Sequence, residues 1–293
     1  MQSGILVVDK PSGWTSHQVV GRCRRLLGTR KVGHAGTLDP MATGVLVIGV
    51  GRGTRLLGHL ALTTKTYEAT IRLGQATNTD DADGEVTQAT GAVAVSDAAI
   101  ESALDALRGD IVQVPSTFSA IKVDGKRAYA LARAGADVEL AGRPVTVSRF
   151  EVLARRAARA EVAVTDLDVA VDCSSGTYIR ALARDLGASL GVGGHLTALR
   201  RTRVGGFDLA GALSPDELTA DPPQAPALMP LGEVARRSFA VVELTDDQAR
   251  DVGYGRPLSI TVPDDPTALL HQHDLLALYR PDGDRAVPVA VLA

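Results

Sequence analysis

Segments in which apolar and polar residues alternate place the strongest limit on the fold of this chain. Residues 66–73 alternate clearly, and residues 161–173 form a second segment of this kind. A period of two predicts β-strands with one buried face. Short apolar runs at residues 5–9 and 45–50 predict two further, more deeply buried strands.

Segments with the helical period lie between these strands. We expect one helix that Ser16 caps and Gly28 ends, a second after Ser96, and a third at residues 178–190. Residues 33–44 are rich in glycine and are expected to form a loop. This irregular order of helices and hairpin-like strands predicts an α+β fold rather than a repeated βαβ array.

A linker is expected at residues 221–226, which read DPPQAP. From about Phe239 the chain has short strand-like runs separated by Gly, Pro and Asp. We therefore expect a large domain at residues 1–230 and a small β-rich domain at residues 238–293. Within the large domain, residues 115–145 are expected to form a basic excursion with a helix near residues 127–134.

The charges are distributed unevenly along the 293 residues. The net charge is only -3, yet residues 1–60 hold eight Lys or Arg and two acids, whereas residues 241–293 hold nine acids and four Arg. A localised basic region is typical of a polyanion site on one face of a protein, although ordinary surface variation explains it equally well. The aromatic content of 3% argues against a broad base-stacking platform.

Nothing in the sequence points to a metal or a cofactor, and we expect none. Cys23 and Cys173 lie outside any CxxC or Cys/His cluster. Residues 49–53 lack the spacing of a phosphate loop, so we assign their glycines to turn geometry. No apolar run approaches the ~20 residues of a membrane span, and no basic leader precedes the first strand. We therefore expect a reduced, cytoplasmic protein without membrane contact.

The segment most suggestive of chemistry is residues 31–46, a glycine-punctuated loop that leads into a buried strand. It holds one acid, Asp39, and one histidine, His34, among small residues. Pro40 restricts its own φ and favours an extended Asp39. Enzymes often place a reacting carboxylate on such a rigid loop. From the pattern alone, an Asx-type turn at Asp39 explains the segment at least as well.

Residues 33–46, which read GHAGTLDPMATGVL, resemble the catalytic motif of the bacterial TruB family of tRNA pseudouridine-55 synthases. Other segments resemble the family in the expected order. They are residues 8–13 (VDKPSG), 65–67 (KTY), 72–74 (RLG), 79–84 (TDDADG), 115–122 (PSTFSAIK), 173–180 (CSSGTYIR) and 195–201 (HLTALRR). The resemblance covers about residues 4–207. Beyond it, residues 255–258 resemble part of a PUA-type domain.

The resemblance implies a pseudouridine-synthase fold, with a central mixed, largely antiparallel sheet flanked by helices, and a PUA-like C-terminal module. It also implies roles for individual residues. Asp39 would be the nucleophile, attacking C1′ of the ribose or C6 of the base, or assisting a glycal intermediate. Arg180 would pair with Asp39, and Asp81 would orient Arg180.

Further roles concern the target uridine. Tyr67 would stack on the uracil, Tyr178 and Leu199 would line its pocket, and His34 would fill the space left by base flipping. Lys10 would support the site. From the pattern alone Tyr67, Tyr178 and Leu199 also fit ordinary core residues, Arg180 a surface arginine and Asp81 a solvated loop acid.

The implied partner is tRNA, recognised by the shape of its T-loop and elbow. Basic groups in residues 22–31, 122–133 and 200–203 would contact phosphates, and residues 115–145 would form an RNA-clasping insertion. We expect a monomer without an obligate protein partner. Two alternatives remain open: a non-catalytic RNA-binding protein on the same scaffold, and a synthase acting on ribosomal RNA or guided by a separate RNA.

Overall fold

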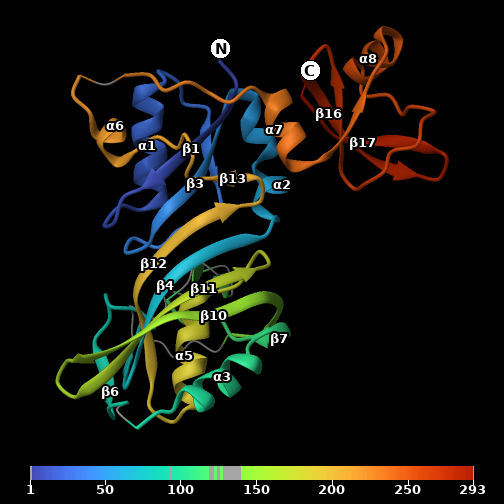
Figure 1. Ribbon diagram of the computed structural model, residues 1–293. Coiled ribbons are helices and arrows are strands. Elements are labelled where there is room, and N and C mark those ends of the chain that lie inside the picture. Colours follow the sequence, from blue (N-terminus) through green and yellow to red (C-terminus); the bar gives the residue numbers. More distant parts are fainter. Residues whose placement is uncertain are drawn as a thin grey trace. The chain divides into compact units, whose positions relative to one another are not determined.

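The computed structural model describes residues 2–92, 94–118, 122–123, 126–127, 140–222 and 224–292 (Figure 1). Contacts divide the chain into two compact units. Unit 1 comprises residues 1–62 and 203–293, and unit 2 comprises residues 63–202. Each unit is described by itself. Most of the excursion expected at 115–145, including its helix near residues 127–134, lies outside the described residues.

Unit 1 is built on an antiparallel pair of buried strands. Strand β1 (Gly4–Lys10) pairs with β3 (Thr43–Val50), and β2 (Val32–Ala35) also pairs with β3. Alternate side chains of β1 and β3 enter two separate cores. One core, with helix α1 (Ser16–Leu26), takes Leu6, Val8, Leu46 and Ile48; the other takes Ile5, Val7, Val45 and Val47. The predicted strands at residues 5–9 and 45–50 are therefore confirmed.

The N-cap of the first helix is one residue earlier than the sequence predicts. Thr15 is its N-cap and forms a capping box with Gln18, whereas Ser16 is already helical and has a buried side chain. The expectation that Ser16 caps the helix is thus wrong, because its hydroxyl bonds elsewhere. The predicted end is confirmed, since Gly28 follows the helix with a φ of 60°.

The glycine-rich residues 49–53 pack backbone against backbone. They lead into the 3₁₀ helix η1 (Gly51–Leu56) and helix α2 (Leu57–Ala61). A Cβ atom on Gly53 would lie 2.2 Å from the carbonyl oxygen of Gly4, so no larger residue fits there. This close approach supports turn geometry, rather than phosphate binding, as the reason for these glycines.

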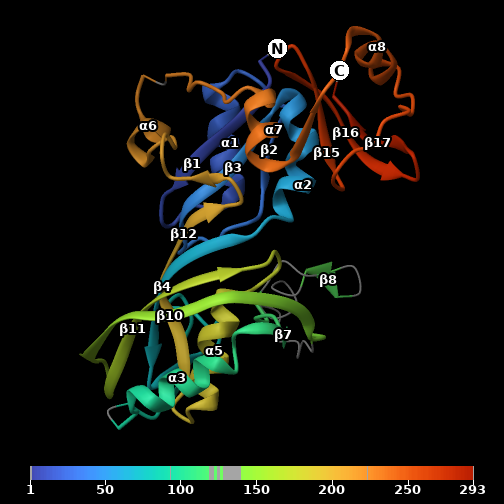
Figure 2. The ribbon, with the colours of Figure 1, turned by 45° about the vertical axis from the view of Figure 1, so that its right-hand side comes forward.

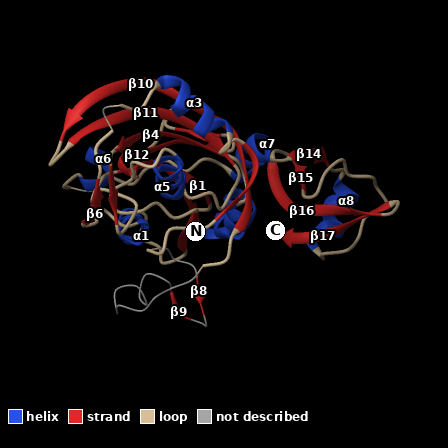
Figure 3. Ribbon diagram, turned by 90° about the horizontal axis from the view of Figure 1, so that it is seen from below, coloured by secondary structure: helices blue, strands red, loops and turns tan. Residues whose placement is uncertain are grey.

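The C-terminal part of unit 1 is rich in strands, as predicted. Strand β13 (Phe207–Asp208), helix α6 (Pro215–Thr219) and helix α7 (Leu231–Ser238) precede it. A four-stranded sheet follows in the order β14-β15-β16-β17, with helix α8 beside it (Figure 3). Its elements are β14 (Ala240–Glu243), α8 (Asp246–Gly253), β15 (Thr267–His271), β16 (Asp274–Asp282) and β17 (Arg285–Val291). The expected domains at residues 1–230 and 238–293 stay a prediction.

Both faces of this C-terminal sheet are buried within unit 1. Leu270 and Leu278 enter the core that also contains Ile5 and Val7, whereas Tyr279 enters a separate core with α8. Two arginines of η1 reinforce the connection by donating to carbonyl oxygens near the end of the chain. They are Arg52, to Leu292 at 3.0 Å, and Arg55, to Val291 at 2.6 Å. The C-terminal sheet is therefore part of the structure that supports β1 and β3.

Unit 2 contains a strongly twisted sheet in the order β12-β4-β11-β10-β7 (Figures 1 and 2). Helices α3 and α5 lie side by side against one of its faces. The elements are β4 (Lys65–Leu73), α3 (Asp97–Asp105), β7 (Gly109–Gln113), β10 (Arg143–Arg159), β11 (Ala163–Cys173), α5 (Ile179–Ser189) and β12 (Gly194–Val204). Two hairpins accompany them, β5 (Gln75–Thr77) with β6 (Val86–Ala89) and β8 (Lys122–Val123) with β9 (Lys126–Arg127).

The sequence-based expectations for unit 2 are largely confirmed. Strand β4 alternates between buried and more exposed positions, Ser96 caps α3, and α5 occupies the expected helix. Pairings of β4 with β11, β11 with β10, and β10 with β7 are all antiparallel, so the α+β class is confirmed. Among the described helices, none is long and apolar enough to cross a membrane.

Replacing Leu278 by alanine tests the structural role of the C-terminal sheet. Leu278 is fully buried, so we expect a loss of about 2–5 kcal/mol in the free energy of unfolding. Val289→Ala, in the same sheet but 39% exposed, is the matched control and should change stability by about 0.5 kcal/mol or less. Denaturant unfolding measures both variants. Equal stabilities would contradict the shared core.

Candidate active site

The loop that carries Asp39 connects β2 to β3. Gly36 and Gly44 stand near its ends with φ values of 77° and 100°, which favour glycine. Leu38 and Ala42 are buried, while Asp39 between them is only half-buried. The amide of Ala42 donates to the Asp39 carbonyl at 3.1 Å. The loop thus has apolar anchors on both sides of a carboxylate that retains solvent access.

Two buried polar residues hold this loop. Lys10 is fully buried, and its Nζ donates to the carbonyl oxygens of Pro11, Trp14 and Pro40 at 2.9, 2.6 and 3.1 Å. Ser16 exchanges two hydrogen bonds with Leu38, donating to its carbonyl at 3.1 Å and accepting from its amide at 3.0 Å. The residues on either side of Asp39 are therefore tied to the end of β1 and the start of α1.

His34 does not lie in the loop. It belongs to β2, opposite Ile48 of β3, so the expected loop at residues 33–44 begins only after Ala35. Gly33 and Gly36 locally favour a loop, but pairing with β3 makes residues 32–35 a strand. The half-buried His34 ring meets the ring of His17 edge-on, with centroids 5.5 Å apart.

The remaining expected site residues belong to unit 2. Tyr67 lies opposite Val171 in the β4–β11 pair and is 6% exposed, and Leu199 of β12 is 8% exposed. Tyr178 is the N-cap residue of α5. Gln113 holds its backbone by accepting from its amide at 2.8 Å and donating to its carbonyl at 3.1 Å. Sequence reasoning missed Gln113, which has no local pattern to reveal it.

Arg180 and Asp81 form a buried ion pair. Arg180 Nη1 lies 3.3 Å from Asp81 Oδ2, and their side chains are 4% and 7% exposed. Arg180 also donates to the carbonyl oxygens of Thr79 and Phe118, both at 2.9 Å. Asp81 accepts from the Thr79 hydroxyl at 2.5 Å. Neither residue is therefore the exposed group that the pattern alone also allowed, and the contact expected between them is present.

A second arginine and acid lie beside this pair. Arg184, one turn further along α5, donates to Asp80 at 3.4 Å and to the Val114 carbonyl at 2.7 Å. Burial raises the pKa of Asp80, an effect that Ser116 and Arg184 oppose. Asp80 also has a φ of 61°. Asp81 in residues 79–84 was expected to orient Arg180, but no local pattern predicts the partner of Asp80.

Two cations are buried together at one end of the unit 2 sheet. Lys65 is 7% exposed and Arg201 is 1% exposed. Burial, together with the charge of Arg201, lowers the pKa of Lys65 to about 8, and Cys173 acts in the opposite direction. Lys65 donates to the Thr63 carbonyl at 2.6 Å. Alternation along β4 places Lys65 on the same face as Tyr67, a signal that the sequence analysis did not use.

Family models match residues 24–222, which include most of the motifs quoted from the sequence. One, described as the N-terminal domain of TruB family pseudouridylate synthases, matches residues 24–179. Another, described as the C-terminal domain of tRNA pseudouridylate synthase B, matches residues 180–222.

Curated relatives are similar over nearly the whole chain. tRNA pseudouridine synthase B of Cutibacterium acnes is 60% identical over 286 residues, covering 97% of this chain and 95% of the relative. The relative of the same name in Nocardia farcinica is 58% identical over 290 residues, covering 99% of this chain and 93% of the relative.

Solved structures share the fold. A chain in an H/ACA ribonucleoprotein bound to a substrate RNA containing 2′-deoxyuridine has a TM-score of 0.71 at 23% identity. A chain in a Cbf5-Nop10-Gar1 complex has a TM-score of 0.73 at 24% identity. Each comparison covers 99% of this chain and 85% of the other.

The fold and the matched segments define a pseudouridine synthase. Within that class, the chain belongs to the TruB family of pseudouridylate synthases. The family expected from the sequence and the pseudouridine-synthase fold are both confirmed. The roles expected for individual site residues, including the pairing of Arg180 with Asp39, stay predictions.

Asp81→Asn tests whether Asp81 positions Arg180. The amide keeps the shape of the carboxylate but leaves the buried guanidinium without its countercharge. We expect kcat for pseudouridine formation to fall about tenfold or more, equivalent to about 1.4 kcal/mol of barrier, with little change in KM. Asp83→Asn, an exposed acid two residues away, is the matched control. A variant with normal kcat would show that the pair is dispensable for turnover.

The lowered pKa of Lys65 predicts a pH-dependent stability. The unfolded chain holds this proton up to about pH 10.5, whereas the folded protein releases it near pH 8. The unfolded state therefore binds more protons between these values, so stability gains from Lys65 as the pH rises through that window. We expect the unfolding free energy of the protein, relative to that of Lys65→Met, to rise by on the order of 2 kcal/mol as the pH increases from about 8 to about 10.5.

Denaturant unfolding at a series of pH values measures this difference. The exposed Lys31→Met variant is the control for the loss of one lysine and should follow the parent protein across the window. Parallel curves for Lys65→Met and the parent protein would contradict the lowered pKa.

Proposed function

We propose that this chain converts uridine 55 in the T-loop of tRNA to pseudouridine, with Asp39 as the nucleophile. The observation that carries the proposal is the Asp39 loop. Its sequence resembles the family's catalytic motif, and Lys10 and Ser16 bind the residues on either side of the carboxylate. The named relatives, tRNA pseudouridine synthases B, support tRNA as the substrate.

The reaction requires no net change in atoms. The bond between N1 of uracil and C1′ of ribose breaks, the base turns, and a bond between C5 and C1′ forms. The proton on C5 is lost and N1 gains one. Asp39 is proposed to form the transient bond at C1′ or C6, or to assist a glycal intermediate, and these three routes stay open.

Other residues are proposed to hold the substrate. Tyr67 would stack on the target uracil, and Tyr178 and Leu199 would line the uracil pocket. His34 would occupy the space that the flipped base leaves, where flipping costs roughly a few kcal/mol. In unit 2 the buried Asp81 supports an orienting role for its ion-pair partner Arg180.

We further propose that the enzyme acts as a monomer in the cytoplasm, without a protein partner. The two cysteines are free and buried, which is compatible with a reducing compartment. The 115–145 segment is proposed to clasp RNA, and the PUA-like module to have at most a secondary role in RNA binding because it is acidic.

Asp39→Asn tests the function and the nucleophile together. The amide is nearly isosteric but is not a competent nucleophile, so we expect turnover of a tRNA transcript to fall by ~10³-fold or more, about 4 kcal/mol of barrier. Binding of tRNA should be unchanged. Pseudouridine mapping after incubation with purified protein measures the product.

A transcript with cytidine at position 55 is the substrate control and should acquire no pseudouridine. If the variant kept a tenth of the parent rate, Asp39 would not be the nucleophile. Product formed only in ribosomal RNA, or only with an added guide RNA, would instead support the alternative synthase classes.

A further inference from the structure

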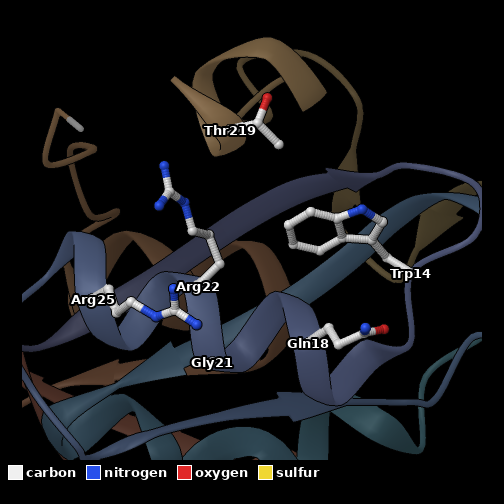
Figure 4. A pocket seen from close by; sticks show the side chains of 6 residues that line it. All are labelled: Trp14, Gln18, Gly21, Arg22, Arg25 and Thr219. Carbon is white, nitrogen blue, oxygen red and sulfur yellow. The ribbon is translucent and has the colours of Figure 1, made fainter. Parts of the chain in front are cut away.

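A pocket of about 410 Å³ opens on unit 1 beside helix α1 (Figure 4). Residues from the segment before α1, from one face of α1 and from the end of α6 form its walls. They are Trp14, Gln18, Gly21, Arg22, Arg25 and Thr219. Gln18, Arg22 and Arg25 are spaced by four and three residues, so they lie on one face of the helix. The size is within the usual range for small-molecule sites.

Trp14, the only tryptophan of the chain, forms one side of this pocket. Its side chain packs partly against the core that α1 shares with β1 and β3. Its carbonyl accepts the 2.6 Å hydrogen bond from Lys10. The ring is therefore held from the core side and presents its remaining surface to the pocket, as an aromatic platform for stacking requires.

Arg22 and Arg25 stand across the pocket from the indole ring (Figure 4). Arg22 is fixed, because its Nε donates to the Leu218 carbonyl at 2.6 Å and its Nη2 to the Ala220 carbonyl at 2.8 Å. Arg25 is exposed and forms no ion pair with the described part of the chain. One guanidinium is thus pre-positioned, and a second can move toward an anion.

Gly21 keeps the floor of the pocket open. A Cβ atom built at this position would meet no atom within 4 Å, although the residue lies within a helix. Any side chain placed there would therefore occupy the pocket rather than clash with the protein. Position 21 offers a way to fill the pocket without disturbing the core.

From these features we propose that the pocket binds one unpaired nucleotide of the tRNA substrate, other than the target uridine. The base stacks on Trp14, Arg25 and Arg22 take its phosphate, and Gln18 and Thr219 offer polar groups to the sugar or the base edge. An aromatic ring and two guanidinium groups in one pocket are the chemistry that recognises a nucleotide. The inference rests on the proposed function, which supplies the RNA.

Lys10 connects this pocket to the loop that carries Asp39. Lys10 donates to the carbonyl of Trp14 and to that of Pro40, the residue after Asp39. The pocket and the loop are thus joined within unit 1 through one buried side chain. This connection favours a nucleotide of the bound tRNA over a free nucleotide as the occupant.

Intrinsic fluorescence provides a direct test, because Trp14 is the only indole in the protein. Selective indole excitation during titration with unmodified tRNA transcript should show saturable quenching. Gly21→Leu, which fills the pocket, and Arg25→Gln, which removes a phosphate partner, should each raise the Kd for tRNA about tenfold. Arg280→Gln removes an exposed charge on β16, outside the pocket and outside the expected phosphate-binding segments, and should change Kd less than twofold.

Pseudouridine formation in the same samples separates the two hypotheses. Two results would overturn the pocket assignment and leave the proposed function intact. One is normal product formation without quenching of Trp14 fluorescence, and the other is normal product formation with the parent Kd for both pocket variants. If tRNA quenches the fluorescence and both pocket variants raise Kd, but no pseudouridine forms with the parent protein, the pocket is supported and the proposed function is overturned. Quenching by free AMP or UMP but not by tRNA overturns the assignment to the substrate RNA.

Discussion

One buried ammonium group organises the part of unit 1 that carries Asp39. Lys10 is fully buried, and an ammonium group without hydrogen-bond acceptors in such a place would cost many kcal/mol. Its carbonyl partners at Pro11, Trp14 and Pro40 therefore have to converge on the end of β1. The same requirement fixes the backbone beside Asp39 and the backbone of Trp14, so the proposed nucleophile and the proposed nucleotide pocket depend on a single interaction.

The strand pair that carries Lys10 depends in turn on residues more than 200 positions away. Alternate side chains of β1 and β3 face opposite directions, so each face requires its own cover. Helix α1 covers one face, and the C-terminal sheet contributes Leu270 and Leu278 to the core on the other. The small C-terminal module is therefore structural support for the candidate site, whatever contact it makes with RNA.

Unit 2 concentrates buried charge. Arg180 and Asp81 neutralise each other, and Lys65 and Arg201 are two cations buried in one region. Burying charge is costly, and folded proteins retain it mainly at functional sites or in well-bonded networks. The Thr79 and Phe118 carbonyls that accept from Arg180 hold its guanidinium in one position.

Local periodicity allowed the sequence by itself to determine the strands at residues 5–9, 45–50 and 66–73, the helix end at Gly28, and the loop that carries Asp39. These features depend on neighbours within a few residues, and the quoted motifs were sufficient to identify the family. Tertiary structure alone decided that Thr15 rather than Ser16 caps α1, and that His34 belongs to a strand. It also decided that Arg180, Asp81 and Lys65 are buried, and that Arg22 binds the end of α6. Each of these outcomes depends on hydrogen bonds or packing between residues distant in the chain, and such contacts leave no periodic trace in the sequence.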